Sequence, residues 1–130
     1  MTPSRTTSTS MLIRTHGANH AVLASRLATA ENFVTRSVGL LGKSSLPQGE
    51  GLWIKRCNSI HTFFMRFPID AVFVDDKLKV VSVYRALKPW RLTRLHFRAS
   101  SVFELPAGTL GTDAIAVGDQ LCVENGGGNG

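Results

Sequence analysis

Residues 69–84 read Ile-Asp-Ala-Val-Phe-Val-Asp-Asp-Lys-Leu-Lys-Val-Val-Ser-Val-Tyr, and this stretch decides the fold. Its two apolar runs are rich in Val, Ile, Phe and Tyr, which favour strands. The polar link Asp75-Asp76-Lys77 between them is typical of a hairpin connection. The stretch therefore predicts two antiparallel strands. Further strands are predicted from short apolar runs at 21–27, 52–56, 60–66, 101–105 and 120–124.

One segment has helical rather than strand periodicity. Apolar residues recur at three- and four-residue spacing over 33–41, which predicts a buried stripe on a helix. Thr29 is a candidate N-cap, and Gly42 is a plausible stop. The predicted fold class is α+β, mainly antiparallel β, with a barrel-like sheet of about six short strands and one principal helix at about 30–42.

The chain has 130 residues, which suffices for one domain. We expect a disordered leader at 1–11, a single folded domain at 12–124 and a flexible Gly-rich tail at 125–130. Met11 is the predicted native start. The first residues lack the apolar stretch of a secretory signal, and no apolar run approaches the ~20 residues of a membrane span. A cytoplasmic protein without a membrane span is therefore predicted.

Positive charge is concentrated in one segment. The chain has 15 Lys and Arg against nine Asp and Glu, a net charge of +6 at pH 7, and residues 85–98 contain no acid. Cations interleaved with aromatic side chains can track a phosphate backbone, so a nucleic-acid binder is one hypothesis. The alternatives are a solvated loop pinned by its aromatics and a pocket rim with Trp90 as an apolar wall. The predicted basic patch consists of Arg85, Lys88, Arg91, Arg94 and Arg98.

Several polar residues stand where the strand pattern favours apolar ones. His61 is predicted to share a strand face with Phe63 and Met65, and Asp70 and Glu104 lie inside apolar runs. A buried carboxylate needs a partner, for which Arg36, Arg66 and His61 are candidates. The structural alternatives are that His61 braces a strand and that Asp70 accepts backbone N–H bonds at a turn.

The preferred hypothesis is a non-catalytic binding module with a polar cleft around His61, Asp70 and Glu104. Its ligand would be small and polar or anionic. No cofactor or metal is predicted, because the chain lacks a CxxC pair and because Cys57, His61, Asp70 and Glu104 could hold a metal only if the fold brought them together. The full set of cleft candidates is Cys57, Asn58, His61, Met65, Arg66, Asp70, Trp90 and Glu104.

A small hydrolase is the alternative to the binding module. Cys57 follows Arg56 in a polar segment, and neighbouring positive charge favours the reactive thiolate. His61, four residues on, could act as its base. This hypothesis uses the same cluster with Cys57 as nucleophile.

Six blocks of sequence occur in a familiar order. Together they resemble the family called domain of unknown function 192, a group of small bacterial and archaeal domains, over about 33–123. The resemblance implies a small, mainly β domain of the α+β class, and it implies no established reaction, cofactor or partner. The blocks are Arg36-Ser-Val-Gly-Leu-Leu-Gly42, Leu46-Pro-Gln-Gly-Glu-Gly-Leu-Trp53, Cys57-Asn-Ser-Ile-His-Thr-Phe-Phe-Met65, Pro68-Ile-Asp-Ala-Val-Phe73, Val102-Phe-Glu-Leu-Pro-Ala-Gly108 and Val117-Gly-Asp119.

Overall fold

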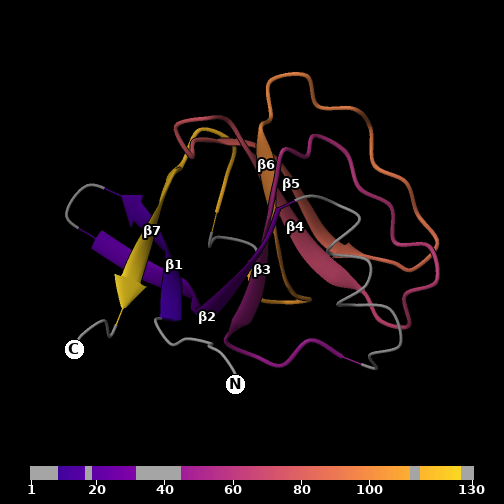
Figure 1. The fold of residues 1–130 in the computed structure, drawn as a ribbon, viewed down its shortest axis with the longest axis horizontal. Coiled ribbons are helices and arrows are strands. Elements are labelled where there is room, and N and C mark those ends of the chain that lie inside the picture. Colours follow the sequence, from indigo (N-terminus) through magenta and orange to yellow (C-terminus); the bar gives the residue numbers. More distant parts are fainter. Residues whose placement is uncertain (1–8, 17–18, 32–44, 112–114, 127–130) are drawn as a thin grey trace.

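A computed structural model describes residues 9–16, 19–31, 45–111 and 115–126, and within these ranges the chain forms strands and no helix. The strands make one sheet in the order β5-β4-β6-β3-β2-β1-β7 (Figure 1). β1 begins before residue 12, and β7 continues past residue 124. The strands are β1 (Thr9–His16), β2 (Asn19–Ala30), β3 (Glu50–Lys55), β4 (Ile69–Val74), β5 (Val80–Leu87), β6 (Ser101–Pro106) and β7 (Gln120–Gly126).

The predicted α+β class with a principal helix is wrong for the described residues. Thr29 and Ala30, which were expected to start the helix, end β2 and pair with Trp53 and Ile54 in a parallel ladder. Pairing with β3 satisfies their backbone groups, so tertiary context overrides the local helical preference. The rest of the predicted helix lies outside the described residues.

The predicted barrel-like closure is also wrong. β5 and β7 are the two edges of the sheet, and among the described residues an isolated bridge joins Gln120 of β7 to Lys79, the residue before β5. β7 pairs with β1 from Thr15↔Gln120 to Thr9↔Gly126. From Gln120 onward β7 runs along β1 and away from β5, so the sheet stays open.

The middle of the sheet is buried on both faces. Every residue of β4 and β6 is buried, and the register aligns Val72 with Phe103 and Phe73 with Val102. Cross-strand partners share a face and successive residues alternate, so these two pairs face opposite sides. Val72 and Phe103 belong to a first core with residues of β1, β2 and β7, and Phe73 and Val102 belong to a second core.

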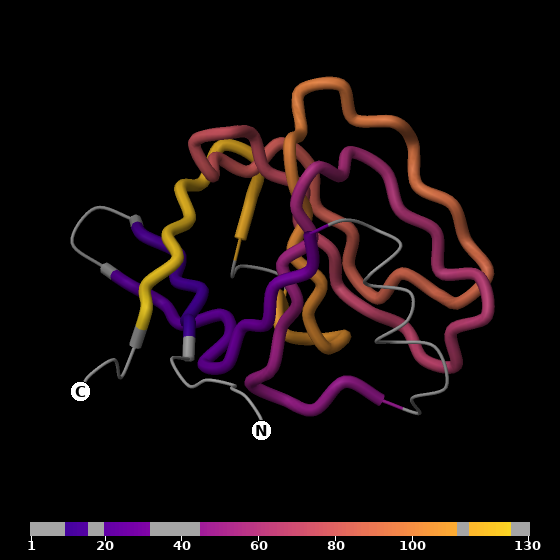
Figure 2. The backbone as a smooth tube through the Cα atoms, viewed as in Figure 1, coloured from indigo at the N-terminus to yellow at the C-terminus, as the bar shows by residue number. Residues whose placement is uncertain are grey.

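Two long loops supply the outer part of the second core. Residues 56–68 join β3 to β4, and residues 88–100 join β5 to β6; we call them the loop pair. They run side by side along one flank of the fold (Figures 1 and 2). Their buried apolar side chains, which pack with Phe73 and Val102, are Cys57, Ile60, Met65, Phe67 and Ala99.

The strand predicted at 60–66 is therefore wrong. The buried positions of the first loop are 57, 60, 62, 65 and 67, so their spacing alternates between three and two. A strand requires a spacing of two throughout. Irregular backbone lets the apolar side chains at 57, 60, 65 and 67 pack into the second core, while Thr62 bonds to the second loop.

The hairpin predicted between β4 and β5 is present, and Asp75 closes its turn. The Asp75 carboxylate accepts backbone N–H bonds from Lys77 at 2.8 Å and from Lys79 at 2.9 Å. These bonds, the one from Lys79 above all, lower the pKa of Asp75 below its ordinary value.

Gly51 lets β2 and β3 pack closely on the first core. A Cβ at this position would lie 2.8 Å from Leu105 Cδ2 and 3.1 Å from the Ala24 Cβ. We expect Gly51→Ala to lower the free energy of unfolding by about 1–3 kcal/mol, because the core must shift to admit a methyl group. Urea denaturation measures this change. Thr29→Ala, at an exposed position of the neighbouring strand, is the matched control; equal stability of the two variants would contradict the close packing at Gly51.

Candidate functional site

Thr62 joins the middle of the first loop to the start of the second loop. It is fully buried, and its hydroxyl donates to the Lys88 carbonyl at 2.6 Å and accepts the Arg91 N–H at 2.9 Å. Its backbone N–H donates to the Arg91 carbonyl, and its carbonyl accepts the Trp90 N–H at 3.0 Å. One side chain therefore sets the path of residues 88–91.

Thr93 repeats this arrangement in the middle of the second loop. Its hydroxyl accepts the Ile60 N–H at 3.0 Å, and its own N–H donates to the Ile60 carbonyl at 2.9 Å. Further backbone bonds run from His96 to Asn58 and from Cys57 to Ser100. The loop pair is thus hydrogen-bonded along its length, which makes its surface preformed.

Sequence reasoning missed Thr62 and Thr93. Both lie between larger neighbours in segments expected to be a strand and a solvated loop. A buried hydroxyl requires a partner, but the neighbours of Thr62 and Thr93 include His61 and Arg94, so the sequence contains no clear signal that either is buried.

A row of aromatic rings lies on the loop pair beside Thr62 and its partners. The rings of His61 and Phe63 stack at 4.6 Å, Phe63 and Trp90 at 5.9 Å, and Phe64 lies 4.6 Å from Trp90. Phe64 and Trp90 have φ angles of 69° and 64°, which are unfavourable for large side chains. The loop hydrogen bonds hold both residues in this conformation, and strain of this kind is concentrated at functional positions.

His61 is part of this row rather than of a strand face with Met65. Its backbone forms an isolated bridge with Leu92, and its ring Nδ1 accepts the Phe63 N–H at 3.2 Å. This bond requires Nδ1 to be unprotonated in the neutral ring. Met65 instead points into the second core, where it is buried.

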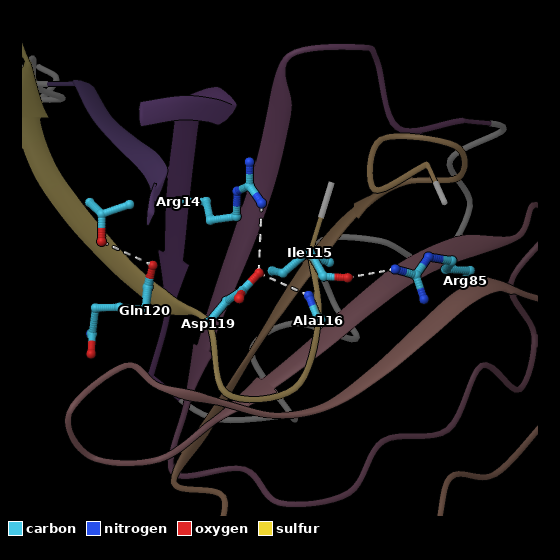
Figure 3. Close-up of polar contacts among 7 residues, drawn as sticks. Arg14, Arg85, Ile115, Ala116, Asp119 and Gln120 are labelled. Carbon is cyan, nitrogen blue, oxygen red and sulfur yellow. Dashed lines mark hydrogen bonds and ion pairs between the residues drawn. The ribbon is translucent and has the colours of Figure 1, made fainter. Parts of the chain in front are cut away.

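The predicted basic patch divides into two parts. Arg85 donates to the carbonyl of Gly111 at 2.6 Å and to the carbonyl of Ile115 at 2.7 Å, the second of which is drawn in Figure 3. These bonds tie β5 to the segment before β7. In that segment Asp119 accepts the Ala116 N–H at 2.9 Å and lies 3.7 Å from an Arg14 nitrogen. The loop pair itself carries Arg56, Arg66, Lys88, Arg91, Arg94 and Arg98 and contains no Asp or Glu.

Asp70 braces the backbone. It is 1% exposed, and its carboxylate accepts N–H bonds from Ala86 at 2.7 Å, Gly108 at 3.1 Å and Leu110 at 2.9 Å. The β4–β5 register slips between the pairs Ile69↔Leu87 and Ala71↔Tyr84. Ala86 occupies this bulge with φ 52°, so Asp70 accepts the N–H that the ladder leaves without a strand partner.

Glu104 and Asp70 lie on opposite faces of the sheet. Asp70 pairs with Leu105, which belongs to the first core, whereas Glu104 pairs with Ala71, which belongs to the second. Both carboxylates are buried. The structure therefore does not bring His61, Asp70 and Glu104 together in one cleft. Glu104 faces the side of the sheet that the loop pair covers.

Cys57 and Asn58 lie where the loop pair leaves the sheet. With Arg56, Ala99 and Ser100 they line an open hollow of about 320 Å³. Cys57 is buried, and its thiol donates to the Ser59 carbonyl at 3.1 Å. A thiol that donates is in its protonated form, which is not the nucleophilic one.

Other candidate residues add no metal site. In the described ranges no three His, Cys, Asp or Glu side chains are placed to hold a metal ion. No helix there is long and apolar enough to cross a membrane. Arg36, the predicted charge partner, lies outside the described residues. Arg66 is exposed on the first loop.

His96 fixes the second loop against the hairpin. Its Nε2 lies 2.7 Å from the Tyr84 hydroxyl, and its ring packs 4.6 Å from Phe73. Burial lowers the pKa of His96 below its ordinary value of 6.5, and the nearby charge of Arg94 lowers it further. The neutral imidazole is thus the form that the folded loop pair favours.

Replacement of Asp70 tests its role as a brace. We expect Asp70→Asn to lower the free energy of unfolding by about 2–4 kcal/mol, because the amide group opposes at least one backbone N–H donor. Chemical denaturation provides the measurement. Asp76→Asn removes an exposed carboxylate from the β4–β5 turn and is the control. A loss no larger than that of Asp76→Asn would show that the three bonds contribute nothing.

The lowered pKa of His96 predicts a pH dependence of stability. The unfolded chain binds a proton at His96 more readily than the folded chain does, so stability falls as the pH drops through 6.5 toward the lower folded pKa. Above this window the contribution is fully present. Melting temperatures of wild type and His96→Gln, compared between roughly pH 8 and pH 5, should show a shallower decline in the variant. Parallel declines would contradict the assignment.

Comparisons with known proteins agree with this fold. The model of the family domain of unknown function 192, described as "Uncharacterized ACR", matches residues 12–123. A UPF0127 protein of Pyrococcus horikoshii is 36% identical over 97 residues, covering 71% of this chain and 82% of the relative. A UPF0127 protein of Pyrococcus furiosus is 33% identical over 97 residues, with 71% and 81% covered.

Two crystal structures resemble the fold at 18% identity. A protein of unknown function from Novosphingobium aromaticivorans has a TM-score of 0.70 and covers 86% of this chain, with 83% of its own length matched. A putative transcription regulator from Sinorhizobium meliloti has a TM-score of 0.68, with 92% and 98% covered. The resemblance noted in the sequence is therefore confirmed: the chain belongs to the uncharacterised family domain of unknown function 192.

Proposed function

We propose that this chain is a non-catalytic binding module whose ligand is anionic, and that the loop pair is its binding surface. The observation that carries this proposal is the charge of the loop pair, which has six Lys and Arg side chains and no carboxylate. The ion pairs between described residues, Arg14–Asp119 and Arg26–Glu50, lie outside it. Positive charge without neutralising partners favours a negatively charged ligand.

The rigidity of the loop pair supports the same proposal. Thr62 and Thr93 hold the two loops together, and buried side chains fix them to the sheet. A surface that is ordered before binding loses less conformational entropy when the ligand arrives. Of the predicted cleft residues, His61, Arg66 and Trp90 belong to this surface, while Asp70 serves the backbone.

Nucleic acid is itself an anionic ligand, and its binding is a second candidate function. Trp90 is exposed beside Arg91, and exposed aromatic rings next to cations can stack on bases. The description of the Sinorhizobium meliloti protein as a putative transcription regulator points the same way for that protein. A single-stranded oligonucleotide is therefore one of the probes below.

Tripolyphosphate is a simple probe of the proposed surface. Calorimetric titration of the full chain should show binding that weakens with added salt. Arg91→Glu with Arg94→Glu should weaken the affinity roughly ten-fold or more, because a charge-assisted hydrogen bond contributes about 1.5–3 kcal/mol.

The matched control reverses two exposed cations in and after the β4–β5 turn. Lys77→Glu with Lys79→Glu changes the net charge equally and should leave the affinity nearly unchanged. Equal losses in the two double variants would assign binding to net charge alone. No binding by wild type would refute the proposed function.

A further inference from the structure

The loop pair combines its charge with an unusual amount of exposed apolar surface. Among the described residues seven large hydrophobic side chains are more than half exposed, and five of them lie on the loop pair. Single exposed apolar residues are ordinary, whereas a group beside charged residues marks an interaction surface. The five, with their exposed fractions, are Phe64 (65%), Trp90 (56%), Leu92 (69%), Leu95 (52%) and Phe97 (84%).

Apolar and positive side chains alternate along the second loop, residues 88–100. Residues 90–98 read Trp-Arg-Leu-Thr-Arg-Leu-His-Phe-Arg, and each Arg directly follows or precedes an exposed apolar residue. Thr93 is buried and bonds to Ile60 of the first loop, and His96 packs on Tyr84 and Phe73. These two residues therefore fix the segment to the rest of the fold. The other side chains of this segment are exposed apolar residues and arginines. Together they suit a surface that offers both phosphate groups and hydrocarbon.

We infer that the loop pair docks on an anionic lipid bilayer, with its apolar side chains in the interface and its cations on the headgroup phosphates. This inference rests on the proposed function and names the source of the anion. Trp is favoured at the level of the headgroups, and long Arg side chains reach phosphates while neighbouring apolar groups insert. Each cation near an anionic leaflet contributes attraction of its own.

The aliphatic residues favour a bilayer over a nucleic acid. Base stacking uses aromatic faces, and Leu92 and Leu95 have none. Insertion into the acyl boundary buries Leu, Phe and Trp alike. Fixed loops also suit a bilayer, because the hydrogen bonds of Thr62 satisfy the backbone groups that would otherwise lose water on insertion.

Vesicle sedimentation of the full chain tests the inference. Wild type should bind vesicles of phosphatidylcholine mixed with phosphatidylglycerol and should not bind pure phosphatidylcholine. Leu92→Ser should weaken binding roughly ten-fold through lost apolar burial. Arg91→Ala and Arg94→Ala should each weaken it roughly five-fold.

Two further measurements separate insertion from a general loss of structure. Val117→Ser removes an equally exposed apolar side chain outside the loop pair and should bind as wild type does. Tryptophan emission should shift to shorter wavelength on anionic vesicles, and this shift should be absent in Trp90→Phe. The other tryptophan, Trp53, is a constant background in both proteins.

The outcomes distinguish the two proposals. Binding of tripolyphosphate without binding of anionic vesicles would overturn the bilayer inference and leave the proposed function intact. Binding of a single-stranded thymidine oligonucleotide in place of vesicles would overturn it in favour of nucleic acid. Loop insertion would be contradicted if Leu92→Ser bound vesicles as tightly as wild type does, or if Trp90→Phe kept the emission shift. No binding of tripolyphosphate would refute the proposed function, and no binding of anionic vesicles either would remove the bilayer inference with it.

Discussion

Burial of β4 and β6 on both faces is the constraint on which the rest of the structure depends. A sheet strand with apolar residues on both sides needs a cover on each. The first cover is the curved sheet itself, through β1, β2 and β7. The second is the loop pair, whose buried side chains complete the core around Phe73 and Val102. The loops that form the candidate binding surface are therefore also structural parts of the core.

Strand-forming runs were the part of the fold that could be read from the sequence. The runs around residues 69–74 and 101–106 are rich in β-forming residues, although each contains one carboxylate, and both are strands. The helix expected from Thr29 onward was wrong where the structure describes it, because a parallel partner strand from β3 competes with the local signal. No local pattern encodes which strands become edges, so the open order of the sheet could not be read either.

The candidate site shows the same limit at the level of single side chains. Asp70 and Glu104 were both identified as carboxylates in apolar runs, and both are buried. Whether they meet depends on the register of β4 against β6, which places Asp70 opposite Leu105 and Glu104 opposite Ala71. A register shifted by one residue would have put them on one face. The concentration of cations in 88–98 is a property of the sequence that depends on no register, and the proposed function rests on it.

The pairing of β1 with β7 has a consequence for synthesis on the ribosome. β1 lies between β2 and β7 in the sheet, although β7 is the last of the described strands in chain order. While residues 120–126 are still to be made, β1 presents an open edge with unpaired backbone groups to other nascent chains. Native pairing of that edge is thus a late event, which falls after most of the domain has left the exit tunnel. Over that interval the cell must keep an unfinished sheet from associating with its neighbours.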